Sequence, residues 1–201
     1  MFRFLVRRFV GSKGMHGGTL NYFDILKVPV AFNIDMEDLQ RNFKSLQKTL
    51  HPDVSYASSK ALPVSSVPPS TISTATDVDS STVNHAYQVL KKPADRVAHL
   101  LKVLGVSGLS EGDVLHDPSI AANAFVLRES IEELKSCDDA RNAIEMHKDI
   151  HSQLMSEGAN IQKYLDQKQW DQLKSSSIWF IYLSKALEEA DAVIENFEKN
   201  L

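Results

Sequence analysis

Apolar residues recur at helical spacing through most of this 201-residue chain, and no segment shows the apolar–polar alternation of a half-buried strand. Leu39, Phe43, Leu46 and Leu50 follow one another at i, i+4, i+7 and i+11, which is the apolar stripe of an amphipathic helix. β-branched residues are sparse outside one Ser/Thr/Pro-rich segment. The sequence therefore predicts an all-α protein. Its C-terminal part is predicted to hold three long helices, over about 117–135, 138–167 and 170–201.

Composition excludes several classes of protein. Cys137 is the only cysteine, so a disulfide scaffold, a zinc ribbon and a CxxC redox site are excluded. Neither a GxGxxG nor a GxxxxGK[ST] string occurs among the eight glycines, which argues against a loop that cradles a nucleotide. No apolar run reaches the roughly 18–20 residues of a membrane span. The net charge of -4 makes nucleic acid a poor partner.

We predict neither a metal site nor a bound cofactor. His147 and His151 stand four residues apart on a predicted helix, a spacing that can bind zinc. However, the segment lacks the glutamate of a zincin and has no third histidine nearby. Negative neighbours at Asp138 and Asp139 disfavour the thiolate of Cys137.

The N-terminal segment differs in charge from the rest of the chain. The first 23 residues contain four basic residues and no acid, whereas the remainder contains 18 basic and 26 acidic residues. Phe2, Leu5, Val6 and Phe9 recur at helical spacing with arginines between them. This combination predicts a mitochondrial targeting presequence over residues 1–18, and hence a protein of the mitochondrial matrix. The alternative is a disordered basic tail.

A Ser/Thr/Pro-rich segment over residues 55–82 separates two helical patterns. Sixteen of its 28 residues are serine, threonine or proline, and it shows no apolar period. Such a segment cannot bury enough surface to offset the entropy of ordering it. We expect a long flexible loop. After it, Pro93 predicts a kink or break in the next helix, which glycines 105 and 108 then end.

The string His51-Pro52-Asp53 follows directly on the helix of residues 39–50. Pro52 fixes its own backbone dihedral, so the side chains of His51 and Asp53 leave a stiff corner in fixed directions. Arg41, Lys44 and Lys48 form a positive stripe on that helix, suited to an acidic partner surface. The alternative interpretation is a simple helix-stop turn beside a solvated helix face.

These residues resemble a J domain, the module that stimulates ATP hydrolysis by DnaK-type chaperones. The aromatic segment 21–26, the helix containing 84–90 and the string 91–96 stand in J-domain order. The resemblance implies that His51, Pro52, Asp53, Arg41, Lys44 and Lys48 bind such a chaperone. The alternative of a hydrolase built on His51 and Asp53 lacks a nucleophile elbow such as GxSxG.

The C-terminal part is similar to HscB-type co-chaperones, in the strings 127–131 and 169–171. That resemblance implies a J domain over 20–104, followed by a scaffold-binding bundle of three helices over 109–201. It also implies an adaptor without catalysis of its own, which delivers an iron–sulfur scaffold protein to a mitochondrial DnaK-type chaperone and promotes cluster transfer. The alternative is a general mitochondrial J protein in folding or import. The chain departs from the family in its long loop and lacks the N-terminal cysteine module of some animal members.

Residue-by-residue matching with that family implies a scaffold-binding patch. Two family aliphatics are alanines here, so the larger Phe125 has to compensate for them. Phe125 and Tyr182 have an alternative interpretation as ordinary core residues, while Trp170, Trp179 and Phe180 are expected in the core because large aromatics at helical spacing usually pack there. The implied patch consists of Ala121, Ala122, Phe125, Glu129 and Tyr182.

Overall fold

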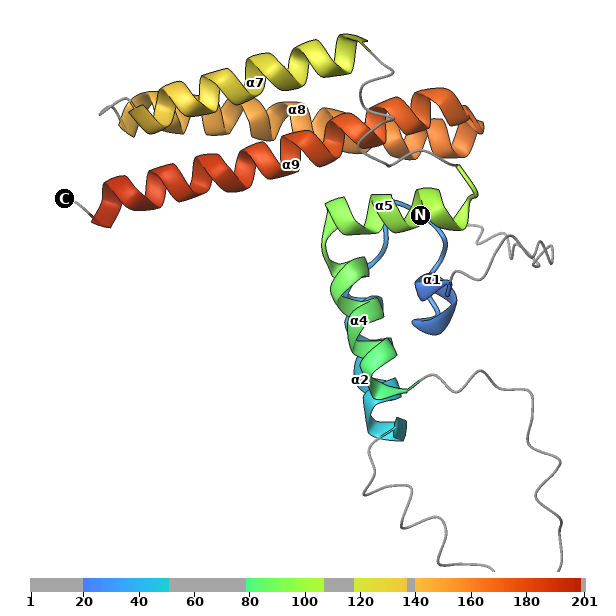
Figure 1. The fold of residues 1–201 in the computed structure, drawn as a ribbon. Helices are drawn as coiled ribbons and strands as arrows, with labels where there is room; N and C mark the ends of the chain where they lie inside the picture. The colour runs from blue at the N-terminus through green and yellow to red at the C-terminus, as the bar shows by residue number, and fades with distance from the viewer. Residues whose placement is uncertain (1–19, 51–78, 107–117, 137–139, 200–201) are drawn as a thin grey trace, which may run out of the picture.

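The computed structural model describes residues 20–50, 79–106, 118–136 and 140–199, and within them the chain is all-helical (Figure 1). The predicted all-α class is confirmed. The predicted presequence, His51-Pro52-Asp53, Cys137 and residues 55–78 lie outside the described residues. None of the described helices combines the length and the apolar character that a membrane crossing requires. The helices are α1 (Tyr22–Ile25), α2 (Met36–Leu50), α4 (Ser80–Lys91), α5 (Pro93–Val103), α7 (Pro118–Ser136), α8 (Ala140–Gln167) and α9 (Trp170–Lys199).

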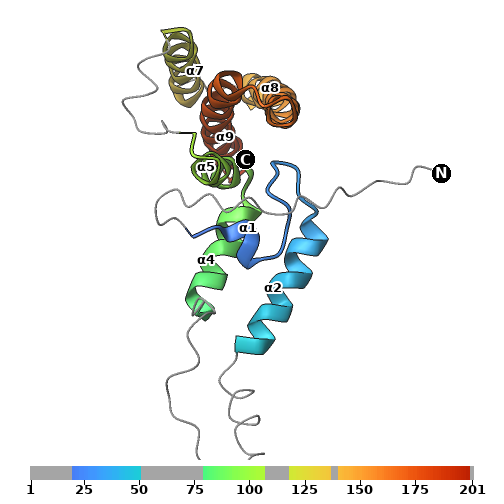
Figure 2. The same cartoon turned by 90° about the vertical axis from the view of Figure 1, so that its right-hand side faces the viewer.

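Helices α2 and α4 form an antiparallel hairpin (Figures 1 and 2). Leu39, Phe43 and Leu46 of the predicted apolar stripe belong to the core that α2 shares with α4, with Leu39 fully buried. The fourth member, Leu50 at the end of the helix, is 36% exposed. The rings of Phe43 and Tyr87 stack between the helices with centroids 4.1 Å apart. Nearer the open end, Gln47 Nε2 donates a hydrogen bond of 2.7 Å to Asn84 Oδ1. Apolar and polar contacts thus join the two helices along most of α2.

The start of α4 differs from the prediction. The helix begins at Ser80, whereas the flexible segment was expected to continue to Thr82. Asp79 explains the earlier start, because its side chain accepts a hydrogen bond of 2.8 Å from the backbone N–H of Thr82. Hydrogen bonding to the Thr82 side chain, together with this bond from the Thr82 backbone N–H, lowers the pKa of Asp79. The break expected at Pro93 is confirmed, since α4 ends at Lys91 and α5 begins at Pro93.

Helices α7, α8 and α9 form the predicted three-helix bundle, with α8 and α9 as its long antiparallel pair (Figure 1). Their bounds agree with the sequence periodicity to within a few residues. Ile131 of α7, Ile150 of α8 and Leu183 of α9 meet in one buried cluster. A second cluster nearer the C-terminus contains Leu134, Ala143 and Val193.

The N-terminal helices and the bundle share one core. Ile161, Leu173 and Phe180 of the bundle belong to the same buried cluster as the residues inside the α1–α5 unit. The ring of Phe32, in the α1–α2 connection, meets Phe180 edge to face at 5.2 Å. Gly158 allows this approach, because a Cβ there would lie 3.3 Å from the ring of Phe32. The core is therefore continuous across the predicted boundary between the two domains.

Arg96 holds the corner between α4 and α5 against the α1–α2 connection. Its buried side chain donates hydrogen bonds of 2.8 Å from Nε to the carbonyl of Leu90 and from Nη1 to the carbonyl of Phe32. A longer bond of 3.4 Å joins Nη2 to the carbonyl of Lys91. Burial lowers the pKa of this guanidinium. Because Phe32 also packs on Phe180, Arg96 helps fix the hairpin relative to the bundle.

Candidate protein-interaction surfaces

The basic residues predicted on α2 share the helix face that points away from α4. Arg41, Lys44 and Lys48 are all exposed, on the side opposite the buried Leu39. Arg41 forms an ion pair with Asp38 one turn earlier, at a solvent-exposed position where such pairs contribute little stability. The positive stripe predicted from the sequence is therefore a real surface feature.

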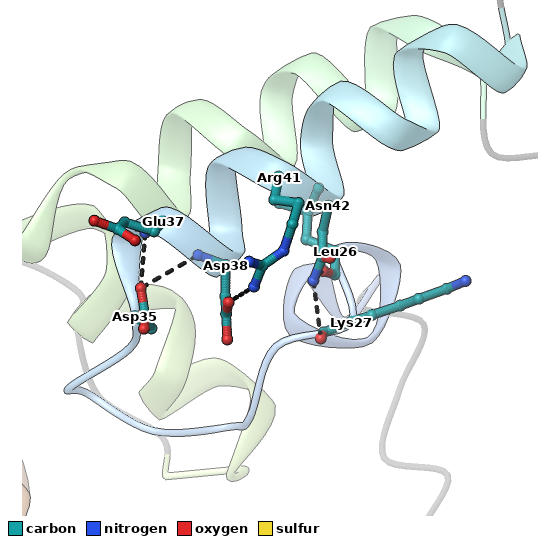
Figure 3. Close-up of polar contacts among 7 residues, drawn as sticks. All are labelled: Leu26, Lys27, Asp35, Glu37, Asp38, Arg41 and Asn42. Atoms are coloured by element: carbon teal, nitrogen blue, oxygen red, sulfur yellow. Dashed lines mark hydrogen bonds and ion pairs between the residues drawn. The ribbon is translucent and has the colours of Figure 1, made fainter.

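Local hydrogen bonds set the position of this surface (Figure 3). The Asp35 side chain accepts hydrogen bonds from the N–H groups of Glu37, at 2.8 Å, and Asp38, at 3.2 Å. Asp35 thus caps the N-terminus of α2. Asn42 Nδ2 donates to the carbonyls of Leu26, at 2.9 Å, and Lys27, at 3.2 Å. These bonds hold the end of α1 against α2 and so fix the position of the helix that carries the basic residues.

The predicted chaperone-binding set is only partly described. Arg41, Lys44 and Lys48 lie on one face, whereas His51, Pro52 and Asp53 lie outside the described residues. The last residue of α2 is Leu50, so the His-Pro-Asp string follows the end of this helix directly. The roles implied for these six residues remain predictions.

The outer face of α7 carries most of the predicted scaffold-binding patch. Ala122, Phe125 and Glu129 are exposed there, and Ala121 is partly buried. The side chain of Phe125 is 62% exposed, which excludes the alternative that it is a core residue. The predicted patch does not include Val126, which is 60% exposed.

Val126 was identifiable in principle. It lies one turn after Ala122 on the predicted helix, so the helical period alone places it beside the patch. We call the side chains of Ala122, Phe125, Val126 and Glu129 the α7 outer face.

Tyr182 occupies a different position from the rest of the predicted patch. Its partly buried side chain, on α9, lines a groove of about 400 Å³ between α7 and α9. Ala121, Ala122, Phe125 and Glu129 do not line that groove. The structure thus separates the predicted patch into the α7 outer face and an adjoining groove that contains Tyr182. Sequence matching alone carries no information about the gap between the two helices.

The large aromatic residues expected in the core have different outcomes. Trp170 was expected in the core but is 43% exposed, because it is the first residue of α9 and lacks a preceding helical turn to cover it. Phe180 is buried as expected, and Trp179 is partly buried against the bundle core.

His147, one of the two histidines at zinc-binding spacing, lies on α8 and contacts α9. Its Nε2 atom is 2.9 Å from Asp191 Oδ1. Within the described residues, no cluster of three or more His, Cys, Asp or Glu side chains is arranged to hold a metal ion.

Comparison with known proteins identifies the family, although no profile of a known protein family matches the chain. The co-chaperone protein HscB of Proteus mirabilis is 25% identical over 183 residues, which cover 90% of this chain and 98% of that protein. The HscB homolog of Vibrio cholerae is 30% identical over 125 residues, covering 62% of this chain and 67% of the relative. The chain belongs to the HscB family of co-chaperones.

Solved structures of HscB-type co-chaperones have the same fold. HscB from Vibrio cholerae superposes with a TM-score of 0.67 at 25% identity, covering 88% of this chain and 99% of that one. Human HscB superposes with a TM-score of 0.66 at 20% identity, covering 87% and 82% of the two chains. These likenesses confirm the predicted arrangement of a J domain followed by a helical bundle. This HscB-type co-chaperone thus has one surface on each unit, the basic face of α2 and the α7 outer face.

Proposed function

We propose that this HscB-type co-chaperone docks a DnaK-type ATPase chaperone through the basic face of α2 and the following His51-Pro52-Asp53. The exposure of Lys44 and Lys48 supports this role, because exposed cations raise the encounter rate with an acidic surface and orient the complex. Asp53 can accept a charge-assisted hydrogen bond from an arginine of the chaperone, and His51 can donate or accept one. Docking stimulates ATP hydrolysis, which takes place on the chaperone. The co-chaperone supplies binding and orientation, without catalysis of its own.

We further propose that the bundle holds an iron–sulfur cluster scaffold protein on the α7 outer face. The observation that carries this proposal is the exposure of Phe125 and Val126, two large apolar side chains that are each at least 60% exposed on neighbouring positions. Apolar side chains that gather on the surface of a soluble protein commonly mark a site of protein–protein contact. Ala122 and Glu129 are exposed beside them and can add a small apolar contact and a charged contact, respectively.

The continuous core supports a joint role for the two surfaces. Phe32 packs on Phe180, and Asn33 donates a backbone hydrogen bond of 3.1 Å to Gln162 Oε1 across the same junction. The J-domain hairpin and the bundle are thereby held in one orientation. A scaffold bound to the bundle is presented in a defined direction to a chaperone docked on α2, and its delivery promotes transfer of the cluster to acceptor proteins.

We propose the mitochondrial matrix as the site of this function. The support is the acid-free, arginine-rich segment of residues 1–18 with its apolar residues at helical spacing. A fluorescent fusion of the full chain is expected to enter mitochondria, and deletion of residues 1–18 is expected to leave it in the cytosol. Mitochondrial entry of the deleted form would contradict this location.

The function is tested with the purified co-chaperone, a mitochondrial DnaK-type chaperone and the scaffold protein. ATP hydrolysis by the chaperone is expected to rise on addition of the co-chaperone and to rise further with scaffold. His51→Gln is expected to abolish the stimulation without changing the melting temperature. Stimulation without scaffold binding would favour a general J protein of folding or import. Hydrolytic activity of the isolated protein would favour an enzyme instead.

A further inference from the structure

Within the described residues, the buried guanidinium of Arg96 donates hydrogen bonds only to neutral acceptors, and no carboxylate pairs with it. Nε and Nη1 donate short bonds to backbone carbonyls, whereas Nη2 makes two longer contacts. These are 3.4 Å to the carbonyl of Lys91 and 3.6 Å to Sδ of Met36. A buried cation is costly unless polar partners surround it, so Nη2 stands to gain most from a stronger acceptor.

Met36, the first residue of α2, supplies the weaker of the two acceptors of Nη2. A thioether sulfur is a weak hydrogen-bond acceptor. Met36 is also 40% exposed, so small solutes can reach a side chain whose sulfur contacts a buried cation. Met155 on α8 is 64% exposed, but its sulfur accepts no hydrogen bond from the part of the chain that the structure describes. The two methionines are therefore both exposed and differ in what surrounds the sulfur.

Oxidation by a peroxide turns a weak acceptor into a strong one. The methionine sulfur attacks one oxygen of hydrogen peroxide, an S–O bond forms as the O–O bond breaks, and the second oxygen leaves as water after proton transfer. The sulfur loses two electrons and the peroxide gains them. The sulfoxide oxygen carries partial negative charge, so a guanidinium N–H donates a shorter and stronger hydrogen bond to it than to a thioether.

We propose that Met36 is a reversible oxidation site, whose sulfoxide oxygen accepts a hydrogen bond from Arg96 Nη2 and strengthens the corner between α4, α5 and the α1–α2 connection. A methionine sulfoxide normally destabilises a protein when it forms in an apolar core. Met36 is exposed, so the added oxygen displaces few apolar contacts. Arg96 also binds the carbonyl of Phe32, whose ring packs on Phe180, so oxidation tightens the hold of the hairpin on the bundle. This property of the corner is independent of which partners the two surfaces bind.

Peroxide treatment of two variants of the full chain tests this assignment. Met155→Leu keeps the sulfur of Met36, whereas Met36→Leu, the matched control, keeps the sulfur of Met155. All other oxidisable residues are common to both variants. Peptide mass spectrometry follows the oxidation of each methionine, and treatment stops while Met146, partly buried in the bundle core, is still reduced.

Urea unfolding before and after treatment measures the effect. Oxidation is expected to raise the urea midpoint of Met155→Leu by about 0.3–0.5 M and to leave that of Met36→Leu unchanged. The two stereospecific methionine sulfoxide reductases together are expected to return the midpoint to its starting value. A midpoint that stays constant or falls when Met36 is oxidised would overturn the proposal, and so would resistance of Met36 to peroxide while Met155 is oxidised. An equal rise in Met36→Leu would also overturn it, because the gain would then not depend on Arg96.

A variant with a permanent acceptor tests the same contact without oxidation. Met36→Gln places an amide oxygen within reach of Arg96 Nη2, so it is expected to unfold at a higher urea concentration than Met36→Leu. Met155→Gln and Met155→Leu form the control pair, and their midpoints are expected to agree. Equal midpoints for Met36→Gln and Met36→Leu would contradict the proposed hydrogen bond.

Discussion

At the residue scale, two buried polar side chains in the N-terminal unit have defined physical roles. His99 Nε2 accepts a hydrogen bond of 3.0 Å from the backbone N–H of Tyr22, and its ring stacks on the Tyr22 ring with centroids 4.2 Å apart. Burial lowers the pKa of His99 to about 4, with smaller contributions from Lys102 and His85. The neutral ring is therefore the form that holds α1 against α5.

The pH dependence of stability follows from the lowered pKa of His99. The unfolded chain takes up the proton near pH 6.5 and the folded protein only near pH 4, so the contribution of His99 to stability is complete above pH 6.5. It is lost as the pH falls from 6.5 to 4. One pKa unit corresponds to about 1.4 kcal/mol, so we expect the free energy of unfolding to fall by about 2 kcal/mol between pH 7 and pH 5. Urea unfolding measures this loss, and His99→Gln is expected to reduce it. The same pH slope in both proteins would contradict the role of His99.

Arg96 provides the second test at this scale. Arg96→Met retains much of the apolar volume but leaves the carbonyls of Leu90 and Phe32 without their donors. Each buried unsatisfied acceptor costs about 1–3 kcal/mol, so we expect a loss of about 3 kcal/mol in the free energy of unfolding, measured with urea. Lys148→Met, at an exposed position of α8, is the control and should change little. An equally small effect of Arg96→Met would mean that these hydrogen bonds contribute little net stability.

At the scale of the helices, α2 and α7 show the same division between a buried and an exposed face. Leu39 of α2 and Ile131 of α7 are buried, while the opposite faces present Lys44 and Lys48 on α2 and Phe125 on α7. The exposed face of α2 is basic, whereas that of α7 is apolar. The two surfaces therefore predict different responses to salt and to substitution.

Charge reversal on α2 is expected to weaken docking to the chaperone. Lys44→Glu with Lys48→Glu places two negative charges on a surface proposed to meet an acidic partner. We expect stimulation of the chaperone ATPase to fall at least about tenfold at low ionic strength, and the difference from wild type to shrink as salt screens it. Steady-state ATP hydrolysis at several salt concentrations measures this. Lys148→Glu with Lys163→Glu on α8 is the control. An equal loss of ATPase stimulation in this control would mean that the change in net charge alone weakens docking.

Truncation on α7 is expected to separate binding from stability. Phe125→Ala with Val126→Ala removes two side chains that are mostly exposed, so we expect the free energy of unfolding to change by less than about 0.5 kcal/mol. Loss of a buried aromatic anchor in a complex typically costs about 2–4 kcal/mol, which predicts roughly 30- to 1,000-fold weaker scaffold binding. Calorimetry with the scaffold measures the affinity, while ATPase stimulation by the J domain should persist. Wild-type affinity in the double variant would exclude the α7 outer face as the binding surface.

At the scale of the whole molecule, the parts predicted best are those governed by local pattern. The stripe beginning at Leu39, the break at Pro93 and the bounds of the three bundle helices all follow from helical period and backbone constraint. The early start of α4 depends on a single capping side chain at Asp79, inside a segment whose composition indicates a loop.

Features made by distant segments were not predictable in the same way. The groove at Tyr182 and the carbonyl contacts of Arg96 depend on helix packing, and a periodic pattern carries no information about which helices become neighbours. The exposure of Trp170 likewise depends on where α9 begins relative to the rest of the bundle.

The continuous core across the J domain and the bundle predicts cooperative behaviour of the whole described fold. Phe180 is buried against Phe32 and belongs to the same cluster as Leu39, so its removal disturbs both units. Phe180→Ala is expected to cost about 3–5 kcal/mol. In hydrogen-exchange mass spectrometry, amides of α2 and α4 should then exchange faster together with those of α8 and α9. Met155→Ala, at an exposed position of α8, should leave all four helices unchanged. Faster exchange in α8 and α9 alone would mean that the two units unfold independently. In that case the junction between hairpin and bundle would not hold a scaffold on the α7 outer face in a fixed direction toward a chaperone docked on α2.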